Sequence, residues 1–302
     1  MSPTHPPIKG IALGFLAYFL FSCSDANVKA LGGHHLPVFE IGFFSTLFAA
    51  LVLLFLKPRD ERWRDAVLVR RPMLVALRGI LGAAAGILGI YAFTTLPFAE
   101  AYALIFLSPS IATILSIFIL AEQVGWRRWF AVALGFSGVL AIVRPGFETL
   151  ELGHLAAFAV SFCAAGTIII LRTLGQTERR VSLLSAVILT SLLMNGVLML
   201  KDFRWPTAAD LPFLALAGLF AGVAQLCLIL ATRSAPANRV APAQYSQMVW
   251  AIIIGGLFFA EFPDLPAIVG ICLIAISGLF TFLREETRGR WWSRIILQRD
   301  RV

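Results

Sequence analysis

Two glutamines and two aromatic residues lie close together in one of the last apolar stretches of the sequence. Gln244 and Gln247 are about one helical turn apart, Tyr245 and Trp250 lie beside them, and Pro242 comes just before. Amide groups can hydrogen-bond a zwitterion, and aromatic rings can stack on a flat group, without the burial of a fixed charge. We therefore expect these four side chains to bind a small polar molecule, and Pro242 to free backbone carbonyls at a gating break. Polar contacts between packed helices would leave a similar pattern.

A second group of this kind surrounds a proline in an earlier apolar stretch. Tyr102, Phe106, Pro109 and Thr113 recur at i, i+4, i+7 and i+11, which places them on one helical face. Ser108 precedes the proline, whose missing N–H leaves a carbonyl without its helical partner. We expect Tyr102, Phe106 and Ser108 to contact the same molecule, and Pro109 to mark a break that takes part in gating.

The composition requires a membrane around these groups. Of 302 residues, 59% are hydrophobic and 14% are charged, whereas a soluble domain has roughly 45–50% apolar and about 25% charged residues. A chain of this size could not cover itself with polar surface, so a soluble fold and intrinsic disorder are both excluded. We expect an all-α integral membrane protein with ten membrane-spanning helices. They are predicted at residues 8–29, 36–56, 73–95, 98–120, 127–143, 152–173, 182–200, 211–233, 237–259 and 266–283.

Five ionisable side chains lie within or at the ends of these segments, where a charge is costly unless it has a partner or a function. Asp25 and Glu40 could exchange a proton or bind an ammonium group, or they could be solvated interfacial acids or partners of a nearby lysine. Arg78 could bind a carboxylate or Glu122, or it could extend to the interface. Glu122 and Glu261 could form a pair of gate residues, or they could be interfacial acids that end their helices. We expect the five to act in gating or coupling.

Tyr18 and Tyr91 are weaker candidates for the binding site. Metal and disulfide chemistry are not expected, because the four cysteines are isolated within apolar segments and the four histidines lie in tails or at helix ends. The sequence therefore predicts no cofactor, no metal and no catalytic residue.

The basic residues predict the orientation. If the N-terminus lies in the cytoplasm, the ten predicted segments place 21 of the 25 Lys and Arg residues on the cytoplasmic side and four on the outside. Cytoplasmic loops carry the excess of Lys and Arg, so both termini are expected inside, in a bacterial inner membrane. The first segment has no cleavage signal and is expected to be retained. This distribution accounts for the net charge of +8 without a nucleic-acid partner.

The sequence also contains an internal repeat. The stretch Gly10–Gly32 aligns without gaps on Gly153–Gly175, and Ala121-Glu122 falls on Ala260-Glu261. Because each half holds five helices, an odd number, the halves have opposite orientations in the membrane, as in many secondary transporters. We expect the first repeat at 1–146, the second at 147–284 and a basic cytoplasmic tail at 285–302.

The stretch 91–146 resembles the EamA family of the drug/metabolite transporter superfamily. The resemblance rests on the LPFAEAYAL start, the AE-xxx-WRRW loop and the GFSGVLAIVRPG end, and the second half extends it over almost the whole chain. It implies ten helices in two EamA repeats and transport of small metabolites, prominently amino acids, often outward. Many members carry arginine where this chain has Ser45, so no basic role is expected there.

The expected function is therefore export of small polar metabolites, such as amino acids, by alternating access. An importer of a vitamin- or nucleoside-like metabolite is the alternative, and a structural or assembly protein is an alternative of another class. An intramembrane enzyme would need a catalytic cluster that the sequence lacks, and a primary pump would need a nucleotide-binding loop, which the sequence also lacks. The expected partners are a small-molecule substrate and the lipid bilayer, with the protein a monomer or a weak homodimer.

Overall fold

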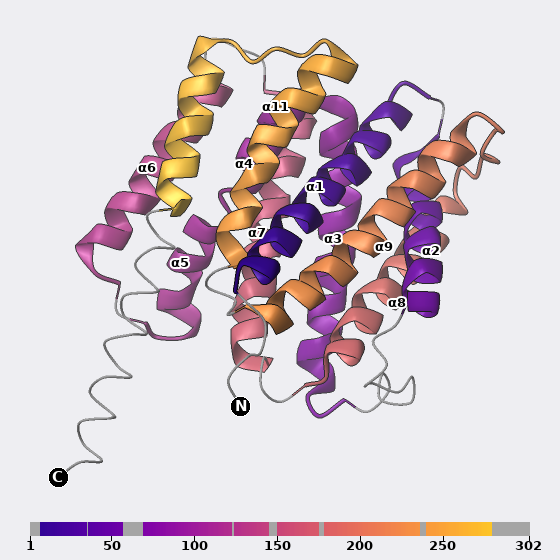
Figure 1. Cartoon of the computed structure of the whole chain (residues 1–302), viewed down its shortest axis with the longest axis horizontal. Coiled ribbons are helices and arrows are strands. Elements are labelled where there is room, and N and C mark those ends of the chain that lie inside the picture. The colour runs from indigo at the N-terminus through magenta and orange to yellow at the C-terminus, as the bar shows by residue number, and fades with distance from the viewer. Residues whose placement is uncertain are drawn as a thin grey trace.

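The computed structural model describes residues 7–34, 36–56, 69–122, 124–144, 150–174, 178–235 and 240–279, and all regular elements in these ranges are helices. They are α1 (Pro7–Leu31), α2 (Val38–Leu56), α3 (Pro72–Thr95), α4 (Phe98–Ile105), α5 (Ser108–Ile119), α6 (Trp126–Val143), α7 (Leu152–Leu174), α8 (Arg180–Met199), α9 (Asp210–Ser234), the 3-10 helix η2 (Ala241–Tyr245), α11 (Ser246–Phe259) and a final helix Leu265–Leu279 (Figure 1). Most of the predicted basic loop, 57–68, and the tail 285–302 lie outside the described residues.

Each predicted segment overlaps a helix of the described residues; the start of segment 237–259 and the end of segment 266–283 lie outside them. Eight helical stretches in the described ranges are long and apolar enough to cross a membrane, with α4 and α5 counted together, and Leu265–Leu279 is a shorter apolar helix. The protein is thus an all-helical, multi-pass membrane protein. The total of ten crossings stays a prediction.

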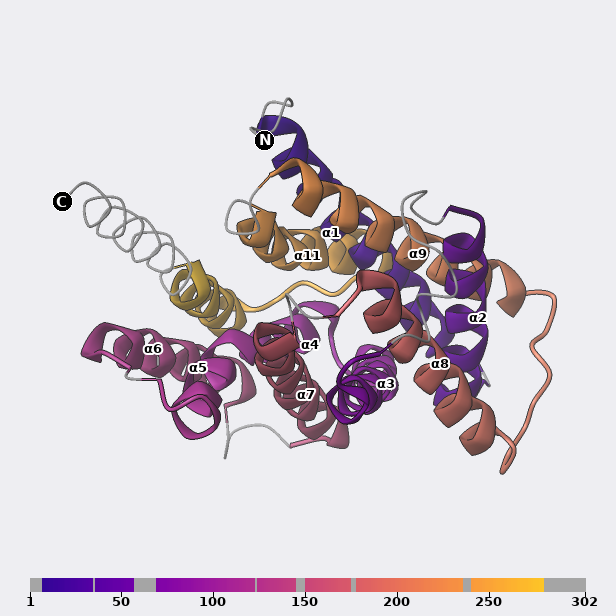
Figure 2. The ribbon, with the colours of Figure 1, turned by 90° about the horizontal axis from the view of Figure 1, so that it is seen from below.

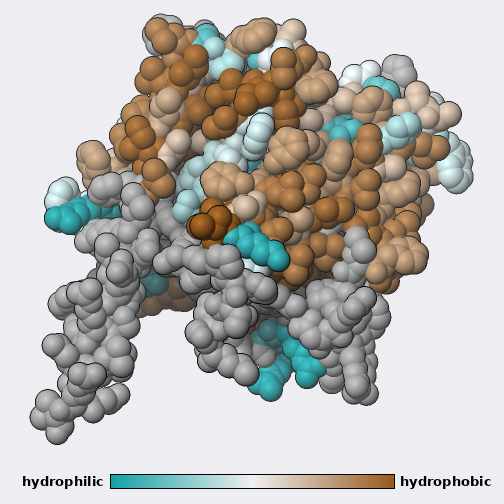
Figure 3. Space-filling view, in the orientation of Figure 1, coloured by the Kyte–Doolittle hydropathy of each residue, from teal (hydrophilic) through white to brown (hydrophobic). Residues whose placement is uncertain are grey.

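The outer surface of the bundle is strongly apolar. Phe55, Phe118, Leu257 and Phe258 are each at least 75% exposed. Brown, hydrophobic residues cover most of the coloured part of the face shown in Figure 3. Exposure of so much apolar area to water would be unfavourable, by about 25 cal/mol for each Å². A lipid environment removes this cost.

Helices of each half of the chain pack mainly against helices of the other half, and the contacts come in equivalent pairs. Helix α1 packs along α9, and α7 packs along α3. Likewise α2 contacts α9 while α8 contacts α3, and α2 and α8 contact each other. Figure 2 shows α1, α9 and α11 in one layer and α3, α4 and α7 in the other. Each layer therefore combines helices from both halves.

Two helices are interrupted near the middle of the bundle. Helix α4 ends at Ile105 and α5 begins at Ser108, so the break lies just before Pro109 rather than at it. The proline ring conflicts with the carbonyl four residues earlier, that of Ile105, while Pro109 itself fits the first turn of α5. In the second half, the 3-10 turn of η2 gives way to α11 after Tyr245. Pro242 lies within η2, and the chain changes from 3-10 to α-helix at Ser246 without a gap.

Helices α5 and α11 end in the same way. Ala121 and Ala260 adopt left-handed backbone conformations with φ of 51° and 54°. The amide of the next residue, a glutamate in both halves, donates to the carbonyl of Ser116 (3.2 Å) or Gly255 (2.9 Å). Each bond reaches back six positions, one more than the bond of a Schellman motif, and satisfies a carbonyl at the helix end. We call the end of the bundle that holds Leu31, Leu96 and Glu261 the upper end, at the top of Figure 1, and the opposite end the lower end.

Candidate substrate-binding site

Three polar side chains from three helices meet inside the bundle. The Tyr102 hydroxyl donates to Asp25 Oδ2 at 2.5 Å, and Gln247 Nε2 donates to the Tyr102 hydroxyl at 3.3 Å. Tyr102 is 3% exposed, Gln247 is 8% exposed and Asp25 is half-buried. We call Asp25, Tyr102 and Gln247 the polar triad. The sequence placed Asp25 among coupling residues and the other two in the binding site, and the structure joins them.

The helix breaks position the triad. Tyr102 lies one turn before the end of α4, and Gln247 lies in the first turn of α11, directly after η2. In an unbroken helix these turns would continue the regular backbone hydrogen bonding. Helix α11 packs against both α1 and α4, and polar side chains of the three helices meet at this junction.

Aromatic rings extend from the triad across the middle of the bundle. The rings of Phe98, Tyr102, Phe106 and Tyr245 follow one another with centroid separations of 5.1, 6.1 and 5.6 Å. We call these four rings the aromatic column. Trp250 packs edge-on to Phe19 at 4.8 Å, and its indole Nε1 is buried without a hydrogen-bond partner in the described part of the chain. The region offers flat apolar faces and one unused donor.

An ion pair lies on the upper side of the triad. Lys29, one turn after Asp25 on α1, places Nζ 2.8 Å from Glu261 Oε1 and donates to the Leu96 carbonyl at 2.7 Å. Glu261 Oε2 accepts from the Phe98 amide at 2.8 Å. The Lys29 side chain is only 9% exposed. The pair therefore ties the upper ends of α1, α3, α4 and α11 together.

Sequence reasoning did not assign Lys29 a function. Two signals were available: its spacing of four residues from Asp25, and its alignment with Arg172 in the repeat. Lys29 pairs with Glu261, rather than with Asp25 or Glu40 as one interpretation suggested.

The other predicted gating residues lie apart from the triad. Glu40 is fully buried at the start of α2 and accepts from the Arg204 amide in the α8–α9 connection. Arg78 donates to the Leu183 carbonyl on α8, not to Glu122. Glu122 lies 3.4 Å from Arg128 near the lower end. These contacts hold helix ends and connections in place.

The remaining predicted binding residues surround the triad at different depths. Ser108 is buried at the start of α5, and Tyr91 packs against the apolar core that contains the column. Tyr18 is half-buried on α1, and its ring packs against Phe21 at 6.2 Å. Gln244 is half-buried in η2, and its side chain makes no hydrogen bond within the described residues.

The predicted continuous face on α4 and α5 is wrong in one respect. The break between the two helices separates Tyr102 and Phe106 from Pro109 and Thr113. The Thr113 hydroxyl donates to the Pro109 carbonyl at 3.0 Å and so belongs to the local helix structure. The i, i+7 and i+11 spacing assumes a regular helix, which the proline prevents.

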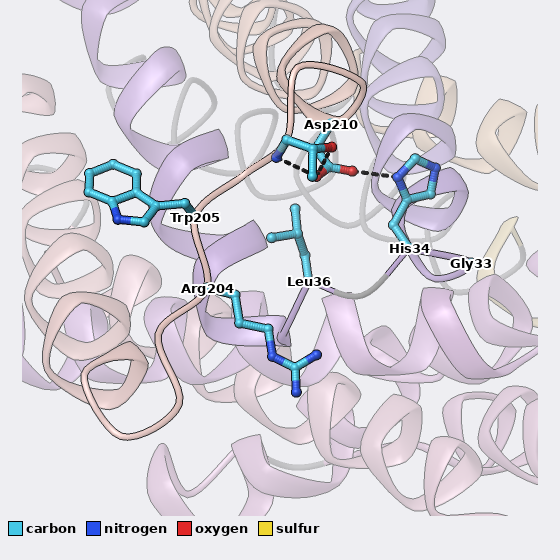
Figure 4. A pocket seen from close by; sticks show the side chains of 7 residues that line it. Gly33, His34, Leu36, Arg204, Trp205 and Asp210 are labelled. Carbon is cyan, nitrogen blue, oxygen red and sulfur yellow. Dashed lines mark hydrogen bonds and ion pairs between the residues drawn. The ribbon is translucent and has the colours of Figure 1, made fainter.

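A cavity of about 410 Å³ opens at the upper end. It is lined by Gly33, His34, Leu36, Arg204, Trp205, Thr207 and Asp210. Figure 4 shows His34, from the turn after α1, paired through Nδ1 with the Asp210 carboxylate at the start of α9. Asp210 Oδ2 also accepts from the Thr207 amide at 2.7 Å. No residue of the polar triad lines this cavity, which belongs to the connections of the upper end.

A second upper cavity, of about 300 Å³, adjoins the ion pair. It is lined by Pro97, Ala99, Glu100, Arg144, Ala260, Glu261, Phe262, Pro263 and Asp264. The Ala267 amide and the Arg144 guanidinium hold the pKa of Asp264 below its usual range. Because Glu261 lines this cavity and also binds Lys29, the ion pair lies between the cavity and the triad. Among the described residues, no group of three or more His, Cys, Asp or Glu could hold a metal.

Comparison with known proteins identifies the family of the chain. The model of the EamA-like transporter family matches residues 8–144 and 151–283. The S-adenosylmethionine uptake transporter of Rickettsia prowazekii (strain Madrid E) is 27% identical over 92% of this chain and 94% of its own length. The pseudopaline exporter CntI of Pseudomonas aeruginosa (strain UCBPP-PA14) is 28% identical over 89% and 94%.

Two further matches are more limited. The riboflavin transporter of Rhizobium johnstonii is 31% identical over 70% of this chain and 69% of its own length. A solved crystal structure, 16% identical, superposes with a TM-score of 0.63 over 91% of this chain and 97% of that one, a likeness of fold alone. The two family matches together cover most of the sequence, so the chain belongs to the EamA-like transporter family, within the drug/metabolite transporter superfamily, and is a transporter rather than an enzyme.

Proposed function

We propose that the protein is a secondary transporter that works by alternating access between two inverted five-helix halves. The polar triad and the aromatic column form its substrate site. The observation that carries this proposal is the meeting of Phe106 and Tyr245, whose rings are 5.6 Å apart. The alignment that places Glu122 on Glu261 also places Phe106 on Tyr245. Equivalent residues touch each other only near a two-fold axis, where such transporters bind substrate.

Packing and helix ends support the inverted halves. The α1–α9 and α7–α3 contacts are related by exchange of the halves, and the breaks before α5 and α11 fall at aligned positions. The left-handed alanines at 121 and 260 are aligned as well. In this arrangement η2 with α11 and the helix Leu265–Leu279 complete the ten crossings.

Alternating access requires contacts that close each end in turn. The Lys29–Glu261 pair closes the upper end in the present conformation. At the lower end, Arg172 and Glu122 occupy the aligned positions in the sequence. We propose that the upper pair separates when substrate is exposed on that side, while the aligned residues approach at the lower end.

The substrates are small polar metabolites, with export of amino acids as the first candidate. The similarity to an exporter supports outward transport. Import of a vitamin- or nucleoside-like metabolite is the second candidate, and similarity to an S-adenosylmethionine uptake transporter and a riboflavin transporter favours it. The polar triad is compatible with both candidates. Its groups can hydrogen-bond either kind of substrate, and they do not determine whether transport is inward or outward.

Transport in proteoliposomes tests the function. Purified protein should catalyse exchange of at least one labelled compound among amino acids, S-adenosylmethionine and riboflavin, and should do so without ATP. Liposomes without protein are the control, and runs with and without a pH gradient separate coupled from passive transport. Absence of protein-dependent flux for the whole panel would contradict the proposal.

We also propose that the protein lies in a bacterial inner membrane as a monomer or weak homodimer. Both termini lie on one side of the membrane, and the upper end lies on the other side. The 21-to-4 division of basic residues supports a cytoplasmic lower end. Single cysteines at positions 290 and 203, in a background lacking the four native cysteines, should respond oppositely to an impermeant thiol reagent on intact cells. Position 203 should react and position 290 should not. The reverse result would invert the topology.

A further inference from the structure

The Asp25 carboxylate is not fully used by its protein contacts. Its hydrogen bond to Tyr102 employs Oδ2, and Oδ1 has no hydrogen-bond partner within the described residues. Asp25 is half-buried, so the carboxylate is not sealed into the packing. A carboxylate at this depth is expensive unless something charged or strongly polar approaches it.

Within the described residues, no basic side chain forms an ion pair with Asp25. Lys29 is the nearest basic residue along α1, and its ammonium group is engaged by Glu261 and the Leu96 carbonyl. The groups that do approach Asp25 are neutral: Tyr102 directly, and Gln247 through Tyr102. Within the described residues, the triad thus has one acidic group and no basic group. A ligand with a positive charge would restore the balance, whereas an anion would be repelled.

The surroundings of Asp25 suit a cation attached to a flat ring. Aromatic faces attract cations within about 6 Å, most strongly when water is excluded. Tyr102, which donates to Asp25, is itself a member of the aromatic column, and the rings of Phe106 and Tyr245 follow it. A ligand with its charge at Asp25 can therefore lay a ring along the column.

We propose that the polar triad binds an organic cation that carries an aromatic group, with Asp25 as the countercharge and the aromatic column as the ring site. This rests on the proposed function, since it names the substrate class of the same site. Gln247 and Tyr102 hold the Asp25 carboxylate in position, and the ligand's ammonium or other cationic centre occupies the free side of that carboxylate.

Three compounds with the same ring and different charge test the proposal. They are phenethylamine (a cation), phenylalanine (a zwitterion) and 3-phenylpropionate (an anion), titrated calorimetrically into the full chain in detergent. Phenethylamine should bind at least tenfold more tightly than phenylalanine, and phenylpropionate should bind most weakly. Asp25→Asn should weaken phenethylamine binding by roughly ten- to a hundredfold, because a hydrogen bond to a charged group is lost. Asp25→Glu, which keeps the charge, should preserve the order of the three compounds.

Glu151→Gln is the matched control, because Glu151 is an exposed acid at the start of α7 and its removal should leave all three affinities unchanged. Should Asp25→Asn fail to fold, the order measured on the wild-type protein and on Asp25→Glu still decides. Equal or reversed affinities for the three compounds, or no phenethylamine binding at millimolar concentration, would overturn the proposal. Flux of amino acids or another neutral solute in proteoliposomes would then leave the transporter function standing with a different substrate class.

Discussion

Gln247→Ala is expected to reduce transport by roughly ten- to a hundredfold. The Gln247 amide donates to the Tyr102 hydroxyl, which in turn donates to Asp25, so its loss frees the hydroxyl to turn away from the carboxylate. A buried polar group that loses its partner costs about 1–3 kcal/mol, which corresponds to this range. Initial rates of uptake into proteoliposomes at fixed protein content measure the effect.

Tyr102→Phe provides the second arm of this experiment. It removes the hydroxyl that both other members of the triad contact, and keeps the ring that packs on Phe106. If the three groups act as one unit, a double variant that combines Gln247→Ala with Tyr102→Phe should transport almost as fast as the slower of the two single variants. Additive losses would show that Gln247 and Tyr102 act separately.

Asn27→Ala is a matched control on α1. The Asn27 amide donates to the Cys23 carbonyl within its own helix, at 2.8 Å, and forms no hydrogen bond with the triad within the described residues. Its replacement should leave transport within about twofold, well under the loss that one net hydrogen bond would cause. If Gln247→Ala behaves like Asn27→Ala in a folded protein, the triad is a structural contact between helices and the substrate binds elsewhere.

The sequence was sufficient to predict the helices, because apolar length is set by the thickness of the bilayer and leaves few alternatives. It also located Tyr102 and Gln247, since polar groups within apolar segments are rare and costly. The sequence did not predict that the break lies at Phe106. Pro109 identifies the turn, but the conflict falls on the carbonyl of Ile105, on the preceding turn.

Interaction partners that lie far apart in the sequence could not be predicted from residue type and spacing. Lys29 and Glu261 are separated by more than two hundred residues, and their pairing depends on how the ends of α1 and α11 approach. The same holds for Arg78, whose partner is a backbone carbonyl on α8 and therefore leaves no side-chain signal. Residue type indicated which positions are costly in a membrane, and only the packing decided what stabilises them.

Glu261→Gln is expected to lower both stability and transport more than Lys29→Gln does. After Glu261→Gln, the partners of the Lys29 ammonium within the described residues are backbone carbonyls and the Phe259 ring, and this side chain is only 9% exposed. Lys29→Gln instead leaves a carboxylate that is 29% exposed and still accepts from the Phe98 amide. Removing one partner of a buried ion pair costs about 3–5 kcal/mol, and the partial exposure of Glu261 places Lys29→Gln below that range. Thermal unfolding in detergent measures the stability loss.

Asp264→Asn tests whether the effect belongs to the Lys29–Glu261 pair. Asp264 forms an ion pair with Arg144 at the same end of the bundle, but it is 51% exposed, and exposed pairs contribute about 0–1 kcal/mol. Asparagine can still accept from the Ala267 amide and keep the final helix capped. This variant should therefore melt close to the wild type and transport at a similar rate.

The exchanged variant, Lys29→Glu with Glu261→Lys, separates gating from simple stabilisation. It restores opposite charges, so part of the stability lost in the single variants should return. The Phe98 amide would then face an ammonium group instead of its carboxylate acceptor, so the start of α4 should no longer be held to α11. Transport should consequently recover less than stability. Full recovery of both, or a Glu261→Gln variant that matches Asp264→Asn, would mean that the pair fastens the upper end without controlling access to the triad.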